Sequence, residues 1–207
     1  MRIKPAVFLD RDGVLTAENS YVCSARELQI FSYTKECIEQ IHRKGYYAIV
    51  ITNQSGIARG LFAEEELHKM NRMLMQETEV DAVYYCPHHP QGKVKKFAIT
   101  CNCRKPQVGL FEKACRDFRI DLKDSFMVGD RAGDILAGIK MGIKTVLLES
   151  GYGSKNLEQD VKPDYCLEDL RKFVELLNMY NYNSLDTGFS DEENGKYNLA
   201  VKHKGQR

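Results

Sequence analysis

The sequence predicts a single α/β domain in which a parallel sheet carries helices on both faces. Short apolar runs at 7–9, 46–52, 81–85, 125–129 and 143–148 are the first observation, since strands buried on both faces appear as continuous apolar segments. Segments with helical character alternate with these runs, which is typical of right-handed crossover units. Finally, polar residues directly follow several of the runs, at the position where open α/β sheets bind ligands.

Length and composition fit one such domain and limit the kinds of partner that we expect it to bind. The chain has 207 residues, of which 43% are hydrophobic and 29% charged, so it can bury a sizeable core. A formal net charge of +1 gives no reason to expect a nucleic acid or a membrane surface as the partner. No apolar run approaches the roughly 20 residues of a membrane span, and no signal peptide precedes the first strand. We therefore expect a cytoplasmic protein.

Two carboxylates follow the first strand directly. An Asp-x-Asp-Gly turn after residues 7–9 sets Asp10 and Asp12 two residues apart. Neighbouring carboxylates disfavour each other's ionisation, and a divalent cation that prefers oxygen ligands, such as Mg²⁺, would relieve this repulsion. One carboxylate could then attack phosphorus while the other transfers a proton. For this motif alone, a polar turn after a strand is the alternative.

The second strand also ends in groups that can bind phosphate. A loop over 17–32 and a helix over 34–44, stopped by Gly45, lead to the strand at 46–52. Hydroxyl, amide and backbone donors at its end could hold phosphate oxygens. They are Thr52, Asn53, Gln54 and Ser55, and Arg59 adds a cation shortly after them. A polar loop that caps the next helix, 63–79, is the alternative interpretation.

A metal-ligating pattern follows the third strand. Cys86, His88 and His89 precede a basic loop that ends in Cys101 and Cys103. Four sulfur and nitrogen ligands at this spacing could close a tetrahedral structural Zn²⁺ site and stabilise the loop over 86–103, which has few core residues of its own. The spacing does not distinguish His88 from His89, and unpaired thiols in a loop are the alternative. With seven cysteines, an odd number, metal binding is favoured over disulfides.

Two cations and two further acids complete the candidate residues. Arg104 and Lys105 follow the cysteines directly and could neutralise a phosphate, although a solvated basic turn before a helix is the alternative. Asp130 ends the buried strand at 125–129, and Asp134 lies one turn into the next helix, where it can face back to the site. Asp130 would complete the oxygen ligands for Mg²⁺. The remaining predicted elements are a helix over 109–118, a strand over 143–148, a surface loop over 151–163 and a closing helix over 167–177.

The order of these residues resembles the four motifs of the haloacid dehalogenase superfamily of phosphotransferases. The motifs stand at Asp10-x-Asp12, Thr52, Lys105 and Gly129-Asp130-x-x-x-Asp134. Within the superfamily, the chain closely resembles the D-glycero-D-manno-heptose-1,7-bisphosphate 7-phosphatases over about residues 5–177. The stretches that carry this resemblance are 8–13, 52–60, 84–90, 101–106 and 127–130.

The resemblance implies a fold, a reaction and two metals. The fold would be a Rossmann-like parallel sheet with helices on both faces, no large cap domain and a zinc-bound loop. Asp10 would attack the C7 phosphorus, and Asp12 would act as the general acid and base. Mg²⁺ would be bound by Asp10, the backbone carbonyl of Asp12 and Asp130, with Asp134 behind them. The Zn²⁺ ligands would be Cys86, His88, Cys101 and Cys103.

The resemblance also implies how the substrate binds. Thr52 and Lys105 would contact the transferring phosphoryl group, and the loop over 52–55 and Arg104 would contact the sugar bisphosphate. Arg59, Arg104 and Arg131 could hold the second phosphate. Members of the family often carry Lys where this chain has Arg131, so the geometry of that cation can differ. The product would be heptose 1-phosphate for ADP- or GDP-heptose synthesis, and the anomer of the substrate stays open.

Three other functions were weighed against this one. Histidinol-phosphate phosphatases share the catalytic plan and often the zinc loop, but they usually carry an acidic residue after the position of Gln54, where this chain has Ser55. A zinc-binding nucleic-acid module would need a basic stripe with interleaved aromatic residues, and the chain has none. A catalytically inactive interaction protein is disfavoured because the five residues expected to carry the chemistry are all present, namely Asp10, Asp12, Thr52, Lys105 and Asp130. We expect residues 1–177 to form a monomeric phosphatase domain, and 178–207 to form a tail without an assigned role.

Overall fold

Six parallel strands form one sheet in the order β3-β2-β1-β4-β5-β6. The computed structural model describes residues 3–157 and 160–185. The strands are β1 (Lys4–Leu9), β2 (Tyr47–Asn53), β3 (Ala82–Cys86), β4 (Ile120–Gly129), β5 (Lys144–Leu148) and β6 (Tyr165–Leu167). The chain adds β2 and β3 on one side of β1 and then returns to add β4 on the other side. The carboxyl ends of β1 and β4 therefore border the crevice at which the strand order reverses, where α/β sheets bind ligands.

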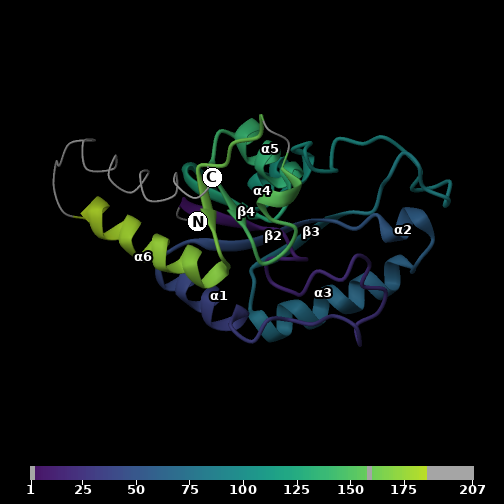
Figure 1. The fold of residues 1–207 in the computed structure, drawn as a ribbon, viewed down its shortest axis with the longest axis horizontal. Helices are drawn as coiled ribbons and strands as arrows, with labels where there is room; N and C mark the ends of the chain where they lie inside the picture. The colour runs from purple at the N-terminus through teal and green to yellow at the C-terminus, as the bar shows by residue number, and fades with distance from the viewer. Residues whose placement is uncertain (1–2, 158–159, 186–207) are drawn as a thin grey trace, which may run out of the picture.

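Helices cover both faces of the sheet (Figure 1). The helices are α1 (Thr34–Arg43), α2 (Gly56–Arg59), α3 (Glu64–Thr78), α4 (Gly109–Asp117), α5 (Ala132–Met141) and α6 (Leu170–Leu185), with a 3₁₀ turn, η1, at Ser154–Asn156. In Figure 1, α1, α3 and α6 lie on one side of the sheet and α4 and α5 on the other. This arrangement confirms the predicted fold class.

The two helical layers explain why the first strand is apolar without interruption. Val7 and Leu9 belong to the core cluster that includes residues of α1, α3 and α6. Phe8 points to the opposite layer, where its ring meets that of Phe111 of α4 at a centroid distance of 5.0 Å. All three side chains are fully buried. A strand that is covered on both faces has no position that favours a polar residue until it reaches its end.

Most predicted elements lie within two residues of their observed bounds, and the C-terminal part differs. Residues 165–167 form β6, which pairs with β5; no strand is predicted there, and residue 167 is the predicted start of the closing helix. The closing helix begins at Leu170 because the Asp169 carboxylate accepts hydrogen bonds from the backbone N–H groups of Arg171 and Lys172. Two other elements differ from the expectation: β4 begins at Ile120, earlier than predicted, and α2 was not predicted.

The helix α6 continues to Leu185, so the tail predicted over 178–207 begins inside a helix. Residues 186–207 lie outside the described part of the chain. Within the described ranges, no helix is both long enough and apolar enough to cross a membrane.

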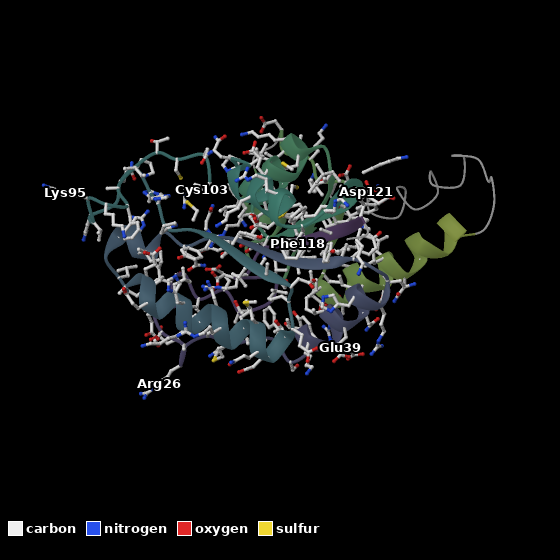
Figure 2. All side chains as sticks on the ribbon, turned by 180° about the vertical axis from the view of Figure 1, so that it is seen from behind. Arg26, Glu39, Lys95, Cys103, Phe118 and Asp121 are labelled. Atoms are coloured by element: carbon white, nitrogen blue, oxygen red, sulfur yellow. The ribbon has the colours of Figure 1, made fainter. Side chains whose placement is uncertain are left out.

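Two long loops lie at the carboxyl edge of the sheet, and no inserted domain stands beside them in the described residues. The loop after β1 folds back so that Thr16 pairs with Ile30. The loop between β3 and α4 is attached to α2, since the backbone N–H groups of Lys93 and Val94 donate to the carbonyl oxygen of Ala58. In Figure 2, Lys95 lies at the outer end of this loop and Cys103 lies nearer the sheet.

Candidate active site

Three acids and one lysine meet at the carboxyl ends of β1 and β4. Asp10 follows β1, Asp130 follows β4, and Asp134 lies in the first turn of α5. Carboxylate oxygens of the three acids lie within 4.8 Å of one another. The Nζ atom of Lys105 lies 2.9 Å from Asp10 Oδ1 and 2.7 Å from Asp134 Oδ1. The structure thus brings together four residues that lie far apart in the chain.

Burial shapes the electrostatics of this cluster. Burial raises the pKa of Asp10 to about 6, although the charge of Lys105 opposes the shift. Burial also raises the pKa of Asp130 to about 8, with the negative charges of Asp10 and Asp134 acting in the same direction. Burial disfavours the charge of Lys105, yet Asp10 and Asp134 hold its pKa above the ordinary value. One lysine does not balance three carboxylates, so a divalent cation would stabilise their ionised forms.

The donor set fits a hard cation such as Mg²⁺. Asp130 is fully buried, and within the described residues its Oδ1 atom has no hydrogen-bond partner, which is costly unless a cation or water satisfies it. Its Oδ2 atom accepts a hydrogen bond from the backbone N–H of Tyr152 at 2.8 Å. Asp134 accepts bonds from the N–H groups of Asp130 and Arg131 through Oδ2, so it holds the backbone of the site in place. Oxygen ligands of this kind suit Mg²⁺.

The Asp12 carboxylate points to a different set of partners. Arg11 Nε lies 2.9 Å from Asp12 Oδ1, and Arg11 Nη2 lies 2.9 Å from Asp12 Oδ2. Gln54 Nε2 also donates to Oδ2, at 2.9 Å. Asp12 is therefore no member of the buried acid cluster, although it lines the same cleft as Asp10.

The donors at the end of β2 have separate tasks. Asn53 Oδ1 accepts a bond from the backbone N–H of Lys105, and Asn53 Nδ2 donates to the carbonyl oxygen of Lys105. Asn53 thus fixes the backbone of the lysine that reaches the acids. Thr52 is buried and accepts a hydrogen bond from Gln54 at 3.0 Å. Ser55 precedes the short helix α2.

A cleft of about 380 Å³ opens above the acid cluster. Most of the predicted site residues line it, namely Asp10, Asp12, Asn53, Gln54, Ser55, Arg104, Lys105, Arg131 and Asp134. Thr52, Arg59 and Asp130 are not among the lining residues. Side chains that the sequence did not indicate also line the cleft, and they include Arg11, Glu18, Tyr21, Phe62 and Tyr152.

The three candidate arginines lie in different surroundings. Arg131 lies 3.0 Å from Glu18, and its guanidinium stacks 3.8 Å from the ring centroid of Tyr152. Arg104 donates to the carbonyl oxygen of His88. Arg59 is not a lining residue; its Nη2 atom lies 3.2 Å from a ring nitrogen of His89, and its guanidinium lies 5.9 Å from the ring centroid of Tyr21, which lines the cleft.

The unpredicted lining residues come from distant parts of the chain. Glu18 belongs to the loop after β1, and Tyr152 to the loop after β5. Neither loop carries a periodic pattern, so only the fold brings them to the cleft.

The cysteine-rich loop brings its four predicted ligands together. Cys103 Sγ lies 3.2 Å from both Cys86 Sγ and Cys101 Sγ, and 3.3 Å from His88 Nδ1. Ligands of a tetrahedral Zn²⁺ ion lie about 3.5–3.8 Å apart, given Zn–S bonds of about 2.3 Å. These separations are too long for disulfide bonds, and all seven cysteines are free. The cluster therefore fits a closed four-ligand site.

The second histidine of the motif faces elsewhere. His89 Nδ1 accepts a hydrogen bond from the backbone N–H of Gln91, and its Nε2 atom faces Arg59. His88, whose Nδ1 atom faces Cys86 and Cys103, is the histidine of the cluster.

Comparisons with known proteins show the family of the chain. A HAD-hydrolase-like family model matches residues 102–173. The D-glycero-beta-D-manno-heptose-1,7-bisphosphate 7-phosphatase of Haemophilus ducreyi is 36% identical over 181 residues, which are 84% of this chain and 99% of the relative. The enzyme of the same name from Vibrio cholerae is 41% identical over 151 residues, which are 70% of this chain and 81% of the relative. The chain belongs to this family of heptose-bisphosphate phosphatases.

A solved structure supports the same assignment. The D,D-heptose 1,7-bisphosphate phosphatase from B. bronchiseptica, complexed with magnesium and phosphate, superposes with a TM-score of 0.73 and 32% identity, over 85% of this chain and 99% of that one. The family assignment confirms the resemblance and the fold class inferred from the sequence. It makes the chain a HAD-like phosphatase, and hence a phosphoric monoester hydrolase.

Proposed function

We propose that this protein is a Mg²⁺-dependent phosphatase that removes the C7 phosphate of D-glycero-D-manno-heptose 1,7-bisphosphate through an aspartyl-phosphate on Asp10. The observation that carries the proposal is the buried contact of Lys105 with Asp10 and Asp134 at the switch point of the sheet, in a member of the heptose-bisphosphate phosphatase family. The product would be heptose 1-phosphate for ADP- or GDP-heptose synthesis.

Asp10 is the nucleophile in this proposal. Its Oδ1 atom already accepts bonds from Lys105 Nζ and from the backbone N–H of Arg11, which leaves Oδ2 to attack phosphorus. A phosphorus–oxygen bond forms to Oδ2 as the bond to the C7 oxygen breaks. Lys105 stabilises the negative charge of the transferring phosphoryl group.

Asp12 moves the proton in both steps. It donates a proton to the departing C7 oxygen, and then accepts one from the water that attacks the aspartyl-phosphate. The second step breaks the bond between phosphorus and Asp10, releases phosphate and restores both carboxyl groups. The position of Asp12 on the same cleft as Asp10 supports this role.

Asp10, the backbone carbonyl of Asp12 and Asp130 would hold Mg²⁺, and Asp134 would keep the surrounding backbone in place. When bound, the ion supplies positive charge that neutralises the carboxylates and the phosphate oxygens. The cysteine-rich cluster would hold a structural Zn²⁺, because all four ligand positions are filled by the protein.

Cations on the wall of the cleft would bind the second phosphate. Arg104 and Arg131 line the cleft and can offer bidentate hydrogen bonds to a phosphate. Asn53, Gln54 and Ser55 line its other side and would contact the sugar. Arg59 lies outside the lining, next to the lining residue Tyr21, and would add positive charge near the cleft.

The test is phosphate release with both anomers of heptose 1,7-bisphosphate and with histidinol phosphate, each with Mg²⁺ and with a chelator. We expect a marked kcat/KM preference for one bisphosphate anomer and no turnover without a divalent ion. A preference for histidinol phosphate would keep the mechanism and overturn the substrate. Full turnover in chelator would overturn the metal dependence.

A further inference from the structure

Arg11 is the largest fully buried side chain in the described part of the chain, and the reaction steps above do not use it. Its side chain is 1% exposed. A guanidinium does not lose its proton in a protein, and its burial is costly unless hydrogen bonds and an opposite charge compensate. The partners of Arg11 therefore indicate what this costly residue does.

The main partner is the carboxylate of Asp12. Two parallel contacts of 2.9 Å join the Nε–Nη2 edge of Arg11 to the two oxygens of Asp12. A bidentate pair fixes the plane of the carboxylate as well as its position. Arg11 Nη2 also donates to Gln54 Oε1 at 3.1 Å, and Gln54 Nε2 donates in turn to Asp12 Oδ2. The three side chains close a ring that holds the carboxylate from two directions.

This ring leaves Oδ1 as the oxygen that can carry a proton. A carboxylate offers about four acceptor positions, and the two on Oδ2 are taken by Arg11 and Gln54. On Oδ1, one position is taken by Arg11. The single hydroxyl proton of Thr16 has two acceptors within reach, Asp12 Oδ1 at 3.2 Å and the carbonyl oxygen of Arg11 at 3.3 Å. When Thr16 donates to the carbonyl, the fourth position on Asp12 is open.

We propose that Arg11 is a positioning residue that orients the Asp12 carboxylate for proton transfer to the leaving oxygen and from the attacking water. The inference rests on the proposed function, because orienting Asp12 matters only if Asp12 is the general acid and base. Arg11 lines the cleft, but its guanidinium is 1% exposed and its hydrogen bonds go to Asp12 and Gln54, so it acts through Asp12 and is no catalytic residue itself. Asp12 has 22% of its side chain exposed toward solvent, so a substrate can reach it.

The test uses two substrates with different leaving groups. A sugar alkoxide needs a proton to depart, whereas p-nitrophenolate departs without one. With p-nitrophenyl phosphate, loss of a correctly placed Asp12 should spare formation of the aspartyl-phosphate and slow only its hydrolysis. Rapid-quench measurements on the Mg²⁺-loaded enzyme should then show a burst of p-nitrophenol followed by slow turnover.

The deciding variant is Arg11→Lys, which keeps the charge and loses the planar fork. We expect turnover of the sugar bisphosphate to fall by roughly 10²-fold, the usual consequence of a misplaced catalytic group, and a burst to appear with p-nitrophenyl phosphate. The exposed Arg72→Met on α3 is the matched control and should behave like the wild type in both assays. Equal losses for both substrates without a burst, or no loss at all, would overturn the proposal.

Two further variants keep these outcomes interpretable. Asp12→Asn should show the same loss of turnover with the sugar bisphosphate and the same burst with p-nitrophenyl phosphate. If Asp12→Asn instead turns over the sugar bisphosphate normally, the proposed mechanism fails before Arg11 is considered. Thermal unfolding is measured for each variant. If Arg11→Lys does not fold, Gln54→Leu opens the same ring from its other side. Because Gln54 would also contact the sugar, the readout in that variant is the burst with p-nitrophenyl phosphate, and absence of the burst would overturn the proposal.

Discussion

At the scale of single residues, the site depends on a few buried charges held at fixed positions. Lys105 is buried and lies within 3 Å of two carboxylates, and Asp130 is buried with one oxygen that has no hydrogen-bond partner among the described residues. Such arrangements are rare in structural cores because unpaired charge is costly there. They are typical of sites that bind a cation or an anionic substrate.

Asp10→Asn should abolish turnover and leave the fold intact, because the amide replaces the attacking oxygen with a poor nucleophile of the same shape. Phosphate release and the thermal midpoint are the measurements. Asp124→Asn, on the exposed part of β4, is the control and should retain activity. Turnover comparable to the wild type in Asp10→Asn would rule out the nucleophile assignment.

Gly13→Ala should disturb the Asp130 carboxylate and so weaken the binding of Mg²⁺. Gly13 has φ of +82°, and a Cβ atom there would lie 2.5 Å from Asp130 Oδ2, too close for an undisturbed carboxylate. We expect loss of stability of about 1 kcal/mol or more from the backbone alone, and in addition a raised Mg²⁺ requirement for phosphate release.

The matched control for that change is Gly142→Ala, at φ of +67° with nothing within 4 Å of the added Cβ. It should lose similar stability and keep the Mg²⁺ dependence of the wild type. If Gly142→Ala raised the Mg²⁺ requirement as much as Gly13→Ala, the effect would not come from the contact with Asp130.

At the scale of elements, loops that lack core residues are held by specific contacts. The loop between β3 and α4 contributes few buried apolar side chains, and its four-ligand cluster lies where the loop leaves β3 and returns to α4. The helix α1 is joined to the start of β3 by a histidine–aspartate pair. Local contacts of this kind decide where an element ends and how firmly it is attached.

Cys101→Ser should lose Zn²⁺ and loosen the loop, because three ligands close a structural site poorly. Zinc content by elemental analysis and proteolysis within 87–100 are the measurements. Cys166→Ser, a half-buried thiol on β6, is the control and should keep its zinc. Full zinc content in Cys101→Ser would exclude that ligand.

The pair of His42 and Asp81 should make stability depend on pH. His42 Nε2 lies 2.9 Å from Asp81 Oδ2; the hydrogen bond to Asp81 raises the pKa of His42 above its ordinary 6.5. Burial acts against the ionised form of Asp81, but its bonds to His42 and the backbone N–H of Ala48 lower its pKa on balance. A raised histidine pKa adds stability that is complete below 6.5 and is lost as the pH rises through the folded-state value.

The measurement is the free energy of unfolding in urea between pH 5.5 and 8.5, for the wild type and His42→Gln. The stability difference between the two should be largest at the acidic end and shrink as the pH rises. A difference that grows with pH would contradict the assigned sign.

At the scale of the whole molecule, the central strand β1 connects the core to the site. Its side chains pack into both helical layers, and its next residue is Asp10.

Phe8→Ala should therefore destabilise the fold by about 3–5 kcal/mol, as expected for a buried phenylalanine. Urea unfolding measures this, and Ile3→Ala, 61% exposed just before β1, should change stability by less than about 0.5 kcal/mol. A small effect of Phe8→Ala would contradict this view of β1.

Much of the fold and the site could be predicted because the signals are local. An apolar run such as 46–52 identifies a strand that is covered on both faces, and Gly45 marks a helix end where φ is positive. The short strand β6 escaped prediction because three half-buried residues carry no periodicity, and only pairing with β5 makes them a strand. Position in the sequence groups Arg59 with the phosphate-binding cations, and in the structure its guanidinium lies 5.9 Å from the ring centroid of Tyr21 and is not part of the cleft lining.

The sequence by itself determined the fold class, the chemical residues and the likeness to a phosphatase family, because strand burial and motif spacing are written into neighbouring residues. Only the tertiary structure decided which charges meet. It grouped Asp130 and Asp134 with Asp10 around Lys105, and it turned Asp12 to Arg11 and Gln54. The physical reason is that a carboxylate in the turn after a strand can point in either direction. Contacts with residues from other parts of the chain, such as Gln54 and Lys105, decide which direction it takes.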